Sequence, residues 1–210
     1  SGTMAYIADV SFLRNSPGIV VVDLKTGAAW RALDKDPSVM PQSWLIRNPT
    51  KTMSWLGGLF TLKPGIDGIA ISKNDQFLVY GAMAHDTLFS VPTAALTRAE
   101  AGQAALQVKA LGRKPLNDGL SMDRNDNIFI TDVEHGSVMK MTPAGLLSTV
   151  VQDVQRLRWA DALSFGPDGW LYVVDSAIPD QMLRSKSHMR EQAPYRIFRF
   201  KPGTEGVPGQ

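Results

Sequence analysis

The sequence predicts an all-β protein of the β-propeller class, in which similar antiparallel sheets stand side by side around one axis. The first observation is an acidic residue followed by a short apolar run, and this segment occurs three times. The copies are Asp67-Gly68-Ile69-Ala70-Ile71, Asp118-Gly119-Leu120-Ser121-Met122 and Asp161-Ala162-Leu163-Ser164-Phe165. Their first residues lie 51 and 43 residues apart. One four-stranded propeller blade takes roughly 40–50 residues, so each copy is predicted to open a new blade.

The second observation is that each copy is followed by a polar turn and a second apolar run. These second runs are Phe77-Leu78-Val79-Tyr80, Ile128-Phe129-Ile130-Thr131 and Trp170-Leu171-Tyr172-Val173-Val174. The turns are rich in Asp, Asn, Gly and Pro, which bend the backbone at low cost. The runs are rich in β-branched and aromatic residues, which favour strands. An innermost strand, a turn and a second strand are therefore predicted in each repeat.

Four repeats are predicted in a single domain, at about 1–40, 67–111, 118–153 and 161–203. The first repeat lacks its innermost strand and the fourth lacks its outermost strand, and the Gly- and Pro-rich tail from 202 to 210 is expected not to pair. The chain is either a closed four-bladed ring or part of a larger ring. The larger ring is favoured, because nothing supplies the two absent strands. An open series of blades would expose strand edges and invite self-association.

Three connecting segments carry separate expectations. Residues 41–66 are an insertion between the first two repeats, read either as a hairpin or as an irregular loop. Residues 92–101 are expected to form a short helical turn or an extended loop, followed by a strand near 104–110. Residues 176–194 are expected to be a long, positively charged loop, which could cover one face of the propeller as a lid.

Composition excludes several kinds of function. Hydrophobic residues make up 44% of the chain and charged residues 20%, which is typical of a folded domain. The net charge of +2 gives no reason to expect nucleic acid or an acidic membrane surface as partner. There are no cysteines, so disulfides and cysteine-ligated metals are excluded. No apolar run is long enough to span a bilayer, and no signal peptide is visible.

The repeated aspartates are the candidate binding site. In a propeller the innermost strands all start on one face, so Asp67, Asp118 and Asp161 are expected to converge around the axis. Carboxylates this close repel one another unless they are protonated or neutralised by a cation. A hard cation with oxygen ligands, calcium or magnesium, is the obvious one to neutralise them. The alternative is that each aspartate accepts backbone N–H groups and only fixes a turn.

Two histidines are expected on the same face. His85 and His135 follow the second strands of their repeats, and the loops there are predicted to border the mouth. A histidine near neutral pH can act as a general base or as a polar contact to a ligand. The alternative is that both are exposed loop residues with no role in binding. No residue is assigned a catalytic role.

Taken in order, these motifs resemble the yellow / major royal jelly protein family. The motifs that carry the resemblance include Tyr6-Ile7-Ala8-Asp9, Leu88-Phe89-Ser90-Val91-Pro92, Ile130-Thr131-Asp132-Val133-Glu134-His135 and Arg158-Trp159-Ala160-Asp161. The resemblance implies a six-bladed propeller, of which this chain looks like the later four blades. It also implies a secreted or periplasmic location and a small-molecule ligand, an aromatic amine in some members, in the central cavity.

A looser similarity reaches the sugar-lactonase propellers of the gluconolactonase type. There, residues matching Asp67 and Asp118 help to hold a divalent cation, whereas a glutamate ligand of that family has no counterpart here. Three hypotheses follow. The first is a small-molecule binding propeller, whose site is formed by Asp67, Asp118, Asp161, His85 and His135. The second is a divalent-metal-dependent lactone hydrolase. The third is a protein-interaction scaffold without chemistry.

Overall fold

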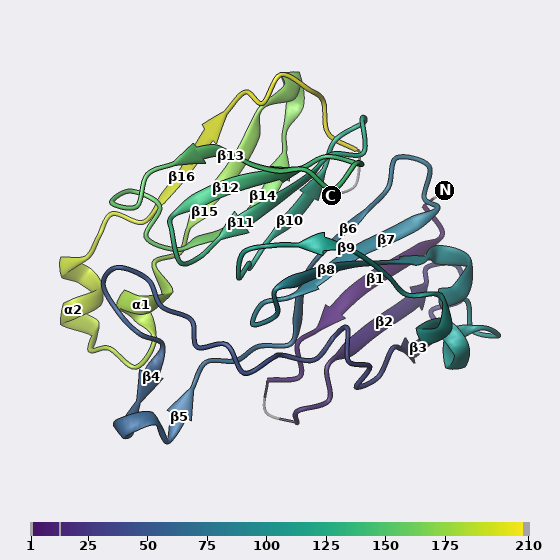
Figure 1. The fold of residues 1–210 in the computed structure, drawn as a ribbon, viewed down its shortest axis with the longest axis horizontal. Helices are drawn as coiled ribbons and strands as arrows, with labels where there is room; N and C mark the ends of the chain where they lie inside the picture. Colours follow the sequence, from purple (N-terminus) through teal and green to yellow (C-terminus); the bar gives the residue numbers. More distant parts are fainter. Residues whose placement is uncertain (1, 13, 208–210) are drawn as a thin grey trace.

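Four antiparallel sheets make up most of the computed structural model, which describes residues 2–12 and 14–207 (Figure 1). The first sheet contains β1 (Met4–Asp9), β2 (Gly18–Asp23) and β3 (Ala29–Ala32). The second contains β6 (Ile66–Ile71), β7 (Phe77–Ala82), β8 (Thr87–Pro92) and β9 (Lys109–Arg113). The third contains β10 (Leu120–Met122), β11 (Ile128–Asp132), β12 (Ser137–Met141) and β13 (Leu147–Gln152). The fourth contains β14 (Ala160–Phe165), β15 (Leu171–Asp175) and β16 (Arg196–Phe200). The predicted all-β fold is confirmed.

Within each sheet the strands follow chain order, and every neighbouring pair is antiparallel. The first strands of the four sheets are neighbours in the order β1, β6, β10 and β14, where β1 is the second strand of its repeat and the other three are innermost strands. The sheets therefore stand in a series, with their starting strands on one side. Apolar clusters fill the spaces between consecutive sheets; Tyr80, Ile130 and Phe129 are wholly buried in the first, second and third of these spaces.

The turns after the innermost strands repeat one backbone feature. Asp75, Asp126 and Asp168 have φ values of 56°, 59° and 61°. Aspartate tolerates this left-handed conformation better than most residues with a side chain. In the third repeat, Asp123 holds the turn by accepting hydrogen bonds from the backbone N–H groups of Asn125 and Asn127, both at 2.8 Å. The polar turn residues therefore direct each strand back along its sheet.

The insertion contains a hairpin, which is one of the two readings that the sequence allowed. The insertion forms the short hairpin β4 (Ser54–Trp55) and β5 (Phe60–Thr61), joined by the 3-10 turn η1 (Leu56–Gly58). The segment expected to be a charged loop contains helices α1 (Ile178–Gln181) and α2 (Lys186–Glu191). Figure 1 shows these helices and the hairpin at the same end of the sheets. The remaining 3-10 helices are η2 (Thr93–Leu96), η3 (Ala101–Gln107) and η4 (Pro167–Gly169).

Two strand expectations need correction. The strand expected near 104–110 begins only at Lys109, because Ala101 and Ala104 are buried on one side of η3. The tail after β16 was expected not to pair, yet Gly206 forms an antiparallel bridge with Asp123, and Val207 N–H donates to Met122 O at 3.1 Å. A Cβ on Gly206 would lie only 2.2 Å from Phe165 Cβ, so glycine makes this contact possible. In the described part of the chain, no helix has the length and hydropathy needed to cross a membrane.

The two ends of the series carry exposed apolar side chains. Ile7 on the first sheet is 50% exposed, and Ile197 on the fourth is 68% exposed.

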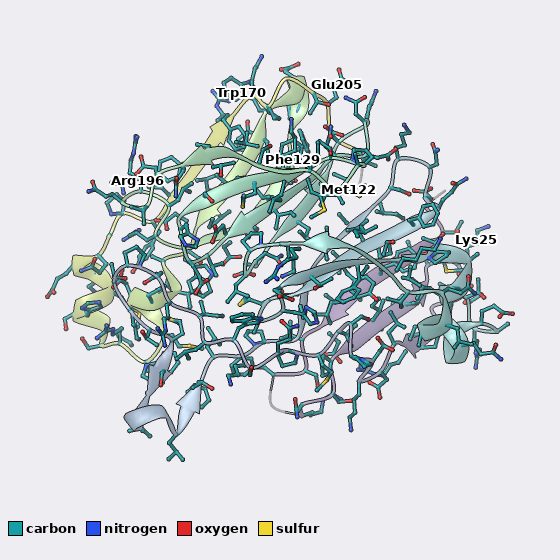
Figure 2. The ribbon with its side chains drawn as sticks, in the orientation of Figure 1. Lys25, Met122, Phe129, Trp170, Arg196 and Glu205 are labelled. Atoms are coloured by element: carbon teal, nitrogen blue, oxygen red, sulfur yellow. The ribbon has the colours of Figure 1, made fainter. Side chains whose placement is uncertain are left out.

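Figure 2 places Arg196, which begins β16, on the side of α1 and α2, while Trp170 and Glu205 lie at the upper edge of the view. Each innermost strand therefore begins at the end of the molecule that holds α1 and α2, and the turn that follows the strand lies at the opposite end.

Candidate functional site

The three repeated aspartates occupy equivalent positions on neighbouring sheets. Asp67 lies in β6, Asp118 stands two residues before β10, and Asp161 lies in β14. The glycine that follows an aspartate determines how close the next sheet can come. A Cβ at Gly68 would lie 2.6 Å from Asp118 O, and one at Gly119 would lie 2.4 Å from Asp161 O. Each Asp-Gly pair therefore receives the backbone of the next repeated aspartate.

The third copy has alanine at the position of these glycines. Ala162 is exposed, whereas Gly68 is buried and Gly119 is partly buried. No carbonyl of a following sheet lies against Ala162 in the described part of the chain, so a methyl group is tolerated there. The difference between Asp-Gly and Asp-Ala thus follows from inter-sheet packing and does not require a difference in ligand binding.

The carboxylates influence one another electrostatically. Burial raises the pKa of Asp67 from its ordinary 3.8 to about 7, and the charge of Asp161 adds to this increase. Burial also raises the pKa of Asp118 well above its usual value, with further contributions from Asp67 and Asp161. Among the described residues, no Lys, Arg or His forms an ion pair with any of the three. Three carboxyl groups therefore share one region without a cationic partner among the described residues, and Asp67 and Asp118 hold their protons more readily than ordinary carboxyl groups.

Asp118 is held in place by two hydrogen-bonding groups. Trp159 Nε1 donates to Asp118 Oδ2 at 2.8 Å, which partly opposes the rise in the pKa of this carboxyl. The hydroxyl oxygen of Thr131 accepts from the backbone N–H groups of Asp118 and Gly119, both at 3.0 Å. Trp159 is wholly buried, so its indole fixes one carboxylate oxygen of Asp118.

A second layer of contacts holds Trp159. Its backbone N–H donates to Asp175 Oδ1 at 3.2 Å, and Asp175 is wholly buried. Arg158 forms an ion pair with the same carboxylate at 2.6 Å and donates to Gln192 O at 2.8 Å. The arginine thereby ties the segment after α2 to the strand that begins beside the site.

The metal prediction was tested against the donor groups that are present. Among the described residues, no group of three or more His, Cys, Asp or Glu side chains is arranged to hold a metal ion. Asp67 and Asp118 alone offer fewer ligands than the six to eight oxygens that calcium prefers. The described side chains therefore do not make a complete calcium site, and the assignment of Asp67 and Asp118 as metal ligands remains a prediction.

The two predicted histidines make local contacts. His85 is 8% exposed; its Nδ1 accepts from Thr87 N–H at 3.0 Å, and its ring stands edge-on to Phe89 at 5.2 Å between centroids. Burial lowers the pKa of His85, with Lys114 as a second cause. His135 is largely exposed and pairs with Asp132 at 2.9 Å. Among the described residues, no hydrogen bond or ion pair joins either histidine to the three aspartates. The role of the two histidines in binding remains a prediction.

Sequence reasoning did not assign a role to three residues that surround Asp118. Trp159 was noted only as part of a motif, although an aromatic residue directly before an innermost strand was a usable signal. Asn117 is wholly buried, and its Oδ1 has no hydrogen-bond partner among the described residues. Lys114 is 5% exposed and lies four residues before Asp118. No local sequence pattern marks these last two as buried.

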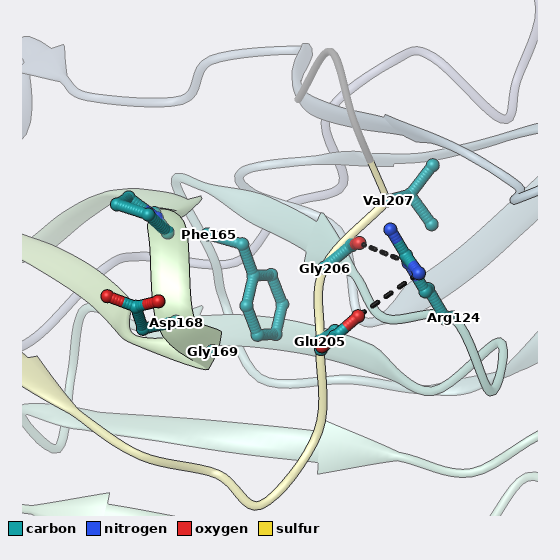
Figure 3. A pocket seen from close by; sticks show the side chains of 9 residues that line it. Arg124, Phe165, Asp168, Gly169, Glu205, Gly206 and Val207 are labelled. Carbon is teal, nitrogen blue, oxygen red and sulfur yellow. Dashed lines mark hydrogen bonds and ion pairs between the residues drawn. The ribbon is translucent and has the colours of Figure 1, made fainter.

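A separate hollow of about 280 Å³ lies where the tail crosses the turns of the third and fourth sheets (Figure 3). Phe165 forms one wall, and Arg124 pairs with Glu205 at 3.1 Å on the other side. Asp168 and Gly169 of η4 complete this end. The hollow borders the ends of the innermost strands, whereas the three aspartates belong to their starts, so it is a different place from the candidate site.

The series of sheets defines a β-propeller protein. Its candidate site is formed by the acidic residues at the starts of the innermost strands, near the propeller axis. The chain belongs to the major royal jelly protein family, whose family model matches residues 1–200. No curated protein sequence matches the chain significantly.

Solved structures with a similar fold include the nidogen/laminin complex, at a TM-score of 0.56 and 15% identity over 83% of this chain and 53% of that chain. A putative 6-phosphogluconolactonase from Bacteroides fragilis matches at a TM-score of 0.54 and 14% identity, over 99% of this chain and 54% of that one. The calcium-binding protein regucalcin from Agrobacterium tumefaciens matches at a TM-score of 0.49 and 16% identity, over 99% and 74%. The chain thus spans about half the length of the first two. At these identities the comparison shows the fold alone.

Proposed function

We propose that the protein binds a small organic cation, an amine, at the carboxylates of Asp67, Asp118 and Asp161. The observation that carries the proposal is that three carboxyl groups share one partly buried region: burial, and after it their mutual repulsion, raises the pKa of Asp67 to about 7 and also raises that of Asp118. A cationic ligand would relieve this repulsion and would displace protons from the site. The family resemblance adds support, because it implies aromatic amines as ligands in some members.

The apolar surroundings of Asp118 favour an organic cation over a bare metal ion. Trp159, Met83 and Leu116 belong to one buried cluster that also includes residues of the insertion. Trp159 contacts Asp118 directly through its indole N–H. A carboxylate beside an aromatic and methionine cluster suits a ligand with a charged amine and an apolar body.

The test compares two ligands that differ by one ammonium group. Isothermal titration calorimetry at pH 7.5 would use dopamine and 4-ethylcatechol, which lacks the amine. We expect dopamine to bind, 4-ethylcatechol to bind at least tenfold more weakly, and the Asp118→Asn variant to lose at least tenfold in dopamine affinity. Asparagine can still accept the hydrogen bond from Trp159, so this variant changes charge and little else. Asp168→Asn, at an exposed turn, is the matched control. Equal binding of both ligands would refute the proposal.

Two further measurements, a thermal shift with calcium and an assay of gluconolactone hydrolysis, separate the remaining hypotheses. A thermal shift on adding calcium, lost in Asp67→Asn, together with hydrolysis of gluconolactone, would favour the metal-dependent hydrolase. A response to neither amine nor calcium would leave an interaction scaffold. Two further expectations stay proposals. One is a secreted or periplasmic location, which cell fractionation tests. The other is self-association through the exposed end sheets, which sedimentation tests.

A further inference from the structure

Lys114 is a buried lysine in the segment that joins β9 to β10. It is 5% exposed, and its side chain passes directly over Gly81 of β7. A Cβ on Gly81 would lie 2.7 Å from Lys114 Cε, so the absence of a side chain at position 81 opens the path. A lysine is almost never buried without partners for its charge. The partners of this ammonium group therefore define its role.

Three backbone carbonyl groups surround Lys114 Nζ. It donates to Ala82 O at 2.9 Å, His85 O at 2.5 Å and Pro115 O at 3.2 Å. These three acceptors match the three hydrogens of an ammonium group. Burial lowers the pKa of Lys114 to about 7, against the opposing charge of Asp86, which is itself paired with Arg113 at 2.9 Å. Lys114 is thus held by oxygen dipoles, in the way that carbonyl oxygens surround a monovalent cation.

The carbonyl groups belong to two segments that converge on the candidate site. Ala82 and His85 lie at the end of β7 and in the turn after it, and β7 pairs with β6, the strand of Asp67. Pro115 belongs to the segment that reaches Asp118 three residues later. Leu116 O then accepts from Val133 N–H at 3.1 Å. The ammonium group therefore bridges the sheet that carries Asp67 and the segment that carries Asp118.

We infer that Lys114 is a tethered cation whose ammonium group fills a backbone-carbonyl site and positions Asp118 opposite Asp67. Lys114 is a positioning residue, because its Nζ contacts carbonyl oxygens and not the carboxylates themselves. The inference rests on the proposed function in one respect, which is the ligand that Asp118 is positioned to bind. The contact itself can be tested without any ligand of the carboxylate site.

The first experiment removes the ammonium group and offers a replacement. Lys114→Ala deletes three carbons and the nitrogen, the shape of propylamine, and removes one donor from each of three carbonyl groups, of which Ala82 O keeps the N–H of His85 at 3.2 Å. We expect the melting temperature to fall by about 10 °C, because each buried acceptor left without a partner is costly. Propylammonium chloride is expected to recover about half of the loss, while tetramethylammonium chloride, which has no N–H, recovers none. The shift that each salt produces in wild-type protein, where propylammonium can bind the carboxylates of the proposed site, is subtracted as the baseline. Equal effects of both salts would overturn the inference.

A matched variant separates charge from packing. Lys114→Met keeps the length of the side chain but has no donor, and its side chain blocks the space that propylammonium would take. We expect it to be destabilised like Lys114→Ala and not to be rescued. A Lys114→Met protein as stable as wild type would show that the carbonyl groups do not need the ammonium group, and the inference would be wrong.

The positioning role has its own readout. The indole Nε1–H of Trp159 donates to Asp118, so its ¹H–¹⁵N resonance, assigned with Trp159→Phe, reports the position of Asp118. We expect this resonance to move in Lys114→Ala and to return with propylammonium. A lower melting temperature with an unmoved indole resonance would show that Lys114 stabilises the turn without positioning Asp118, which overturns the inference.

A second route covers the case in which Lys114→Ala does not fold. Gly81→Ala would place a methyl group 2.7 Å from Lys114 Cε and 3.1 Å from Asn117 Oδ1. It should displace the lysine and move the Trp159 resonance, whereas Gly102→Ala, which meets open space, should leave it unchanged. An unmoved resonance in Gly81→Ala would count against the inference. Failure of wild-type protein to bind dopamine would refute the proposed function but would leave every one of these outcomes readable.

Discussion

Replacing Asp67 with asparagine should stabilise the protein at alkaline pH and leave its stability unchanged at acid pH. The folded state raises the pKa of Asp67 from 3.8 to about 7. Between these two values the folded protein holds a proton that the unfolded chain has released. The free energy of unfolding of the wild type therefore falls as pH rises from about 4 to about 7. Asparagine has no proton to lose, so the variant escapes this loss.

The size of the effect follows from the pKa increase. A difference of about three pKa units corresponds to about 4 kcal/mol, at 1.36 kcal/mol per unit. Asp67 keeps partial solvent exposure and shares its repulsion with Asp161, so about half of this, ~2 kcal/mol, is expected at pH 8. For a chain of this size, that corresponds to a rise in melting temperature of roughly 4–8 °C.

Urea denaturation at pH 4.5, 6 and 8 measures the effect, with wild type and Asp67→Asn compared at each pH. Asp168→Asn is the control: Asp168 is exposed and has a φ of 61°, which asparagine also tolerates. Asp168→Asn should coincide with wild type at every pH, whereas Asp67→Asn should exceed it clearly at pH 8 and by only about a quarter of that difference at pH 4.5. If Asp67→Asn were less stable than wild type at pH 8, the aspartate would be holding a turn, and the reasoning from repulsion would be refuted.

Three further predictions concern packing and stability. Gly119→Ala should destabilise the protein by about 2 kcal/mol or more, because its Cβ would lie 2.4 Å from Asp161 O, and chemical denaturation beside Gly102→Ala measures this. Arg158→Met should cost about 3 kcal/mol by leaving Asp175 buried and unpaired, whereas Arg156→Met, in an exposed pair, should cost less than about 1 kcal/mol; similar losses would contradict the argument. Ser121→Ala should raise the free energy of unfolding by about 1 kcal/mol, since its wholly buried hydroxyl has no hydrogen-bond partner among the described residues; a decrease would show that a partner such as a water molecule exists.

Local patterns in the sequence were enough to predict the strands. The apolar runs and polar turns are local, so the second strands predicted at 77–80, 128–131 and 170–174 overlap β7, β11 and β15. The electrostatic contact among the three aspartates was also predictable, because equivalent positions on repeated sheets share one face. Residues close together in the chain carry the information for the strands, and the repeat of one motif carries it for the aspartates.

The contacts that complete the site were not predictable in this way. Trp159 and Asp118 are separated by 41 residues, and Lys114 Nζ reaches Ala82 O across 32 residues. Carbonyl oxygens carry no sequence signature, so a lysine buried among them looks like an ordinary surface lysine. The pairing of Gly206 with Asp123 was missed for a related reason. A glycine favours loops in general, but here it provides room for the side chain of Phe165.

The glycine after the first two repeated aspartates has a consequence for how such a ring can grow. Duplicating a segment that begins Asp-Gly copies the carboxyl group together with the glycine against which the next sheet packs. The charge and the angle between neighbouring sheets are therefore inherited together. A methyl group removes the space that the glycine leaves. Any sheet placed beside Ala162 would therefore have to stand farther away than the two earlier neighbours do, and the ring would widen at that joint.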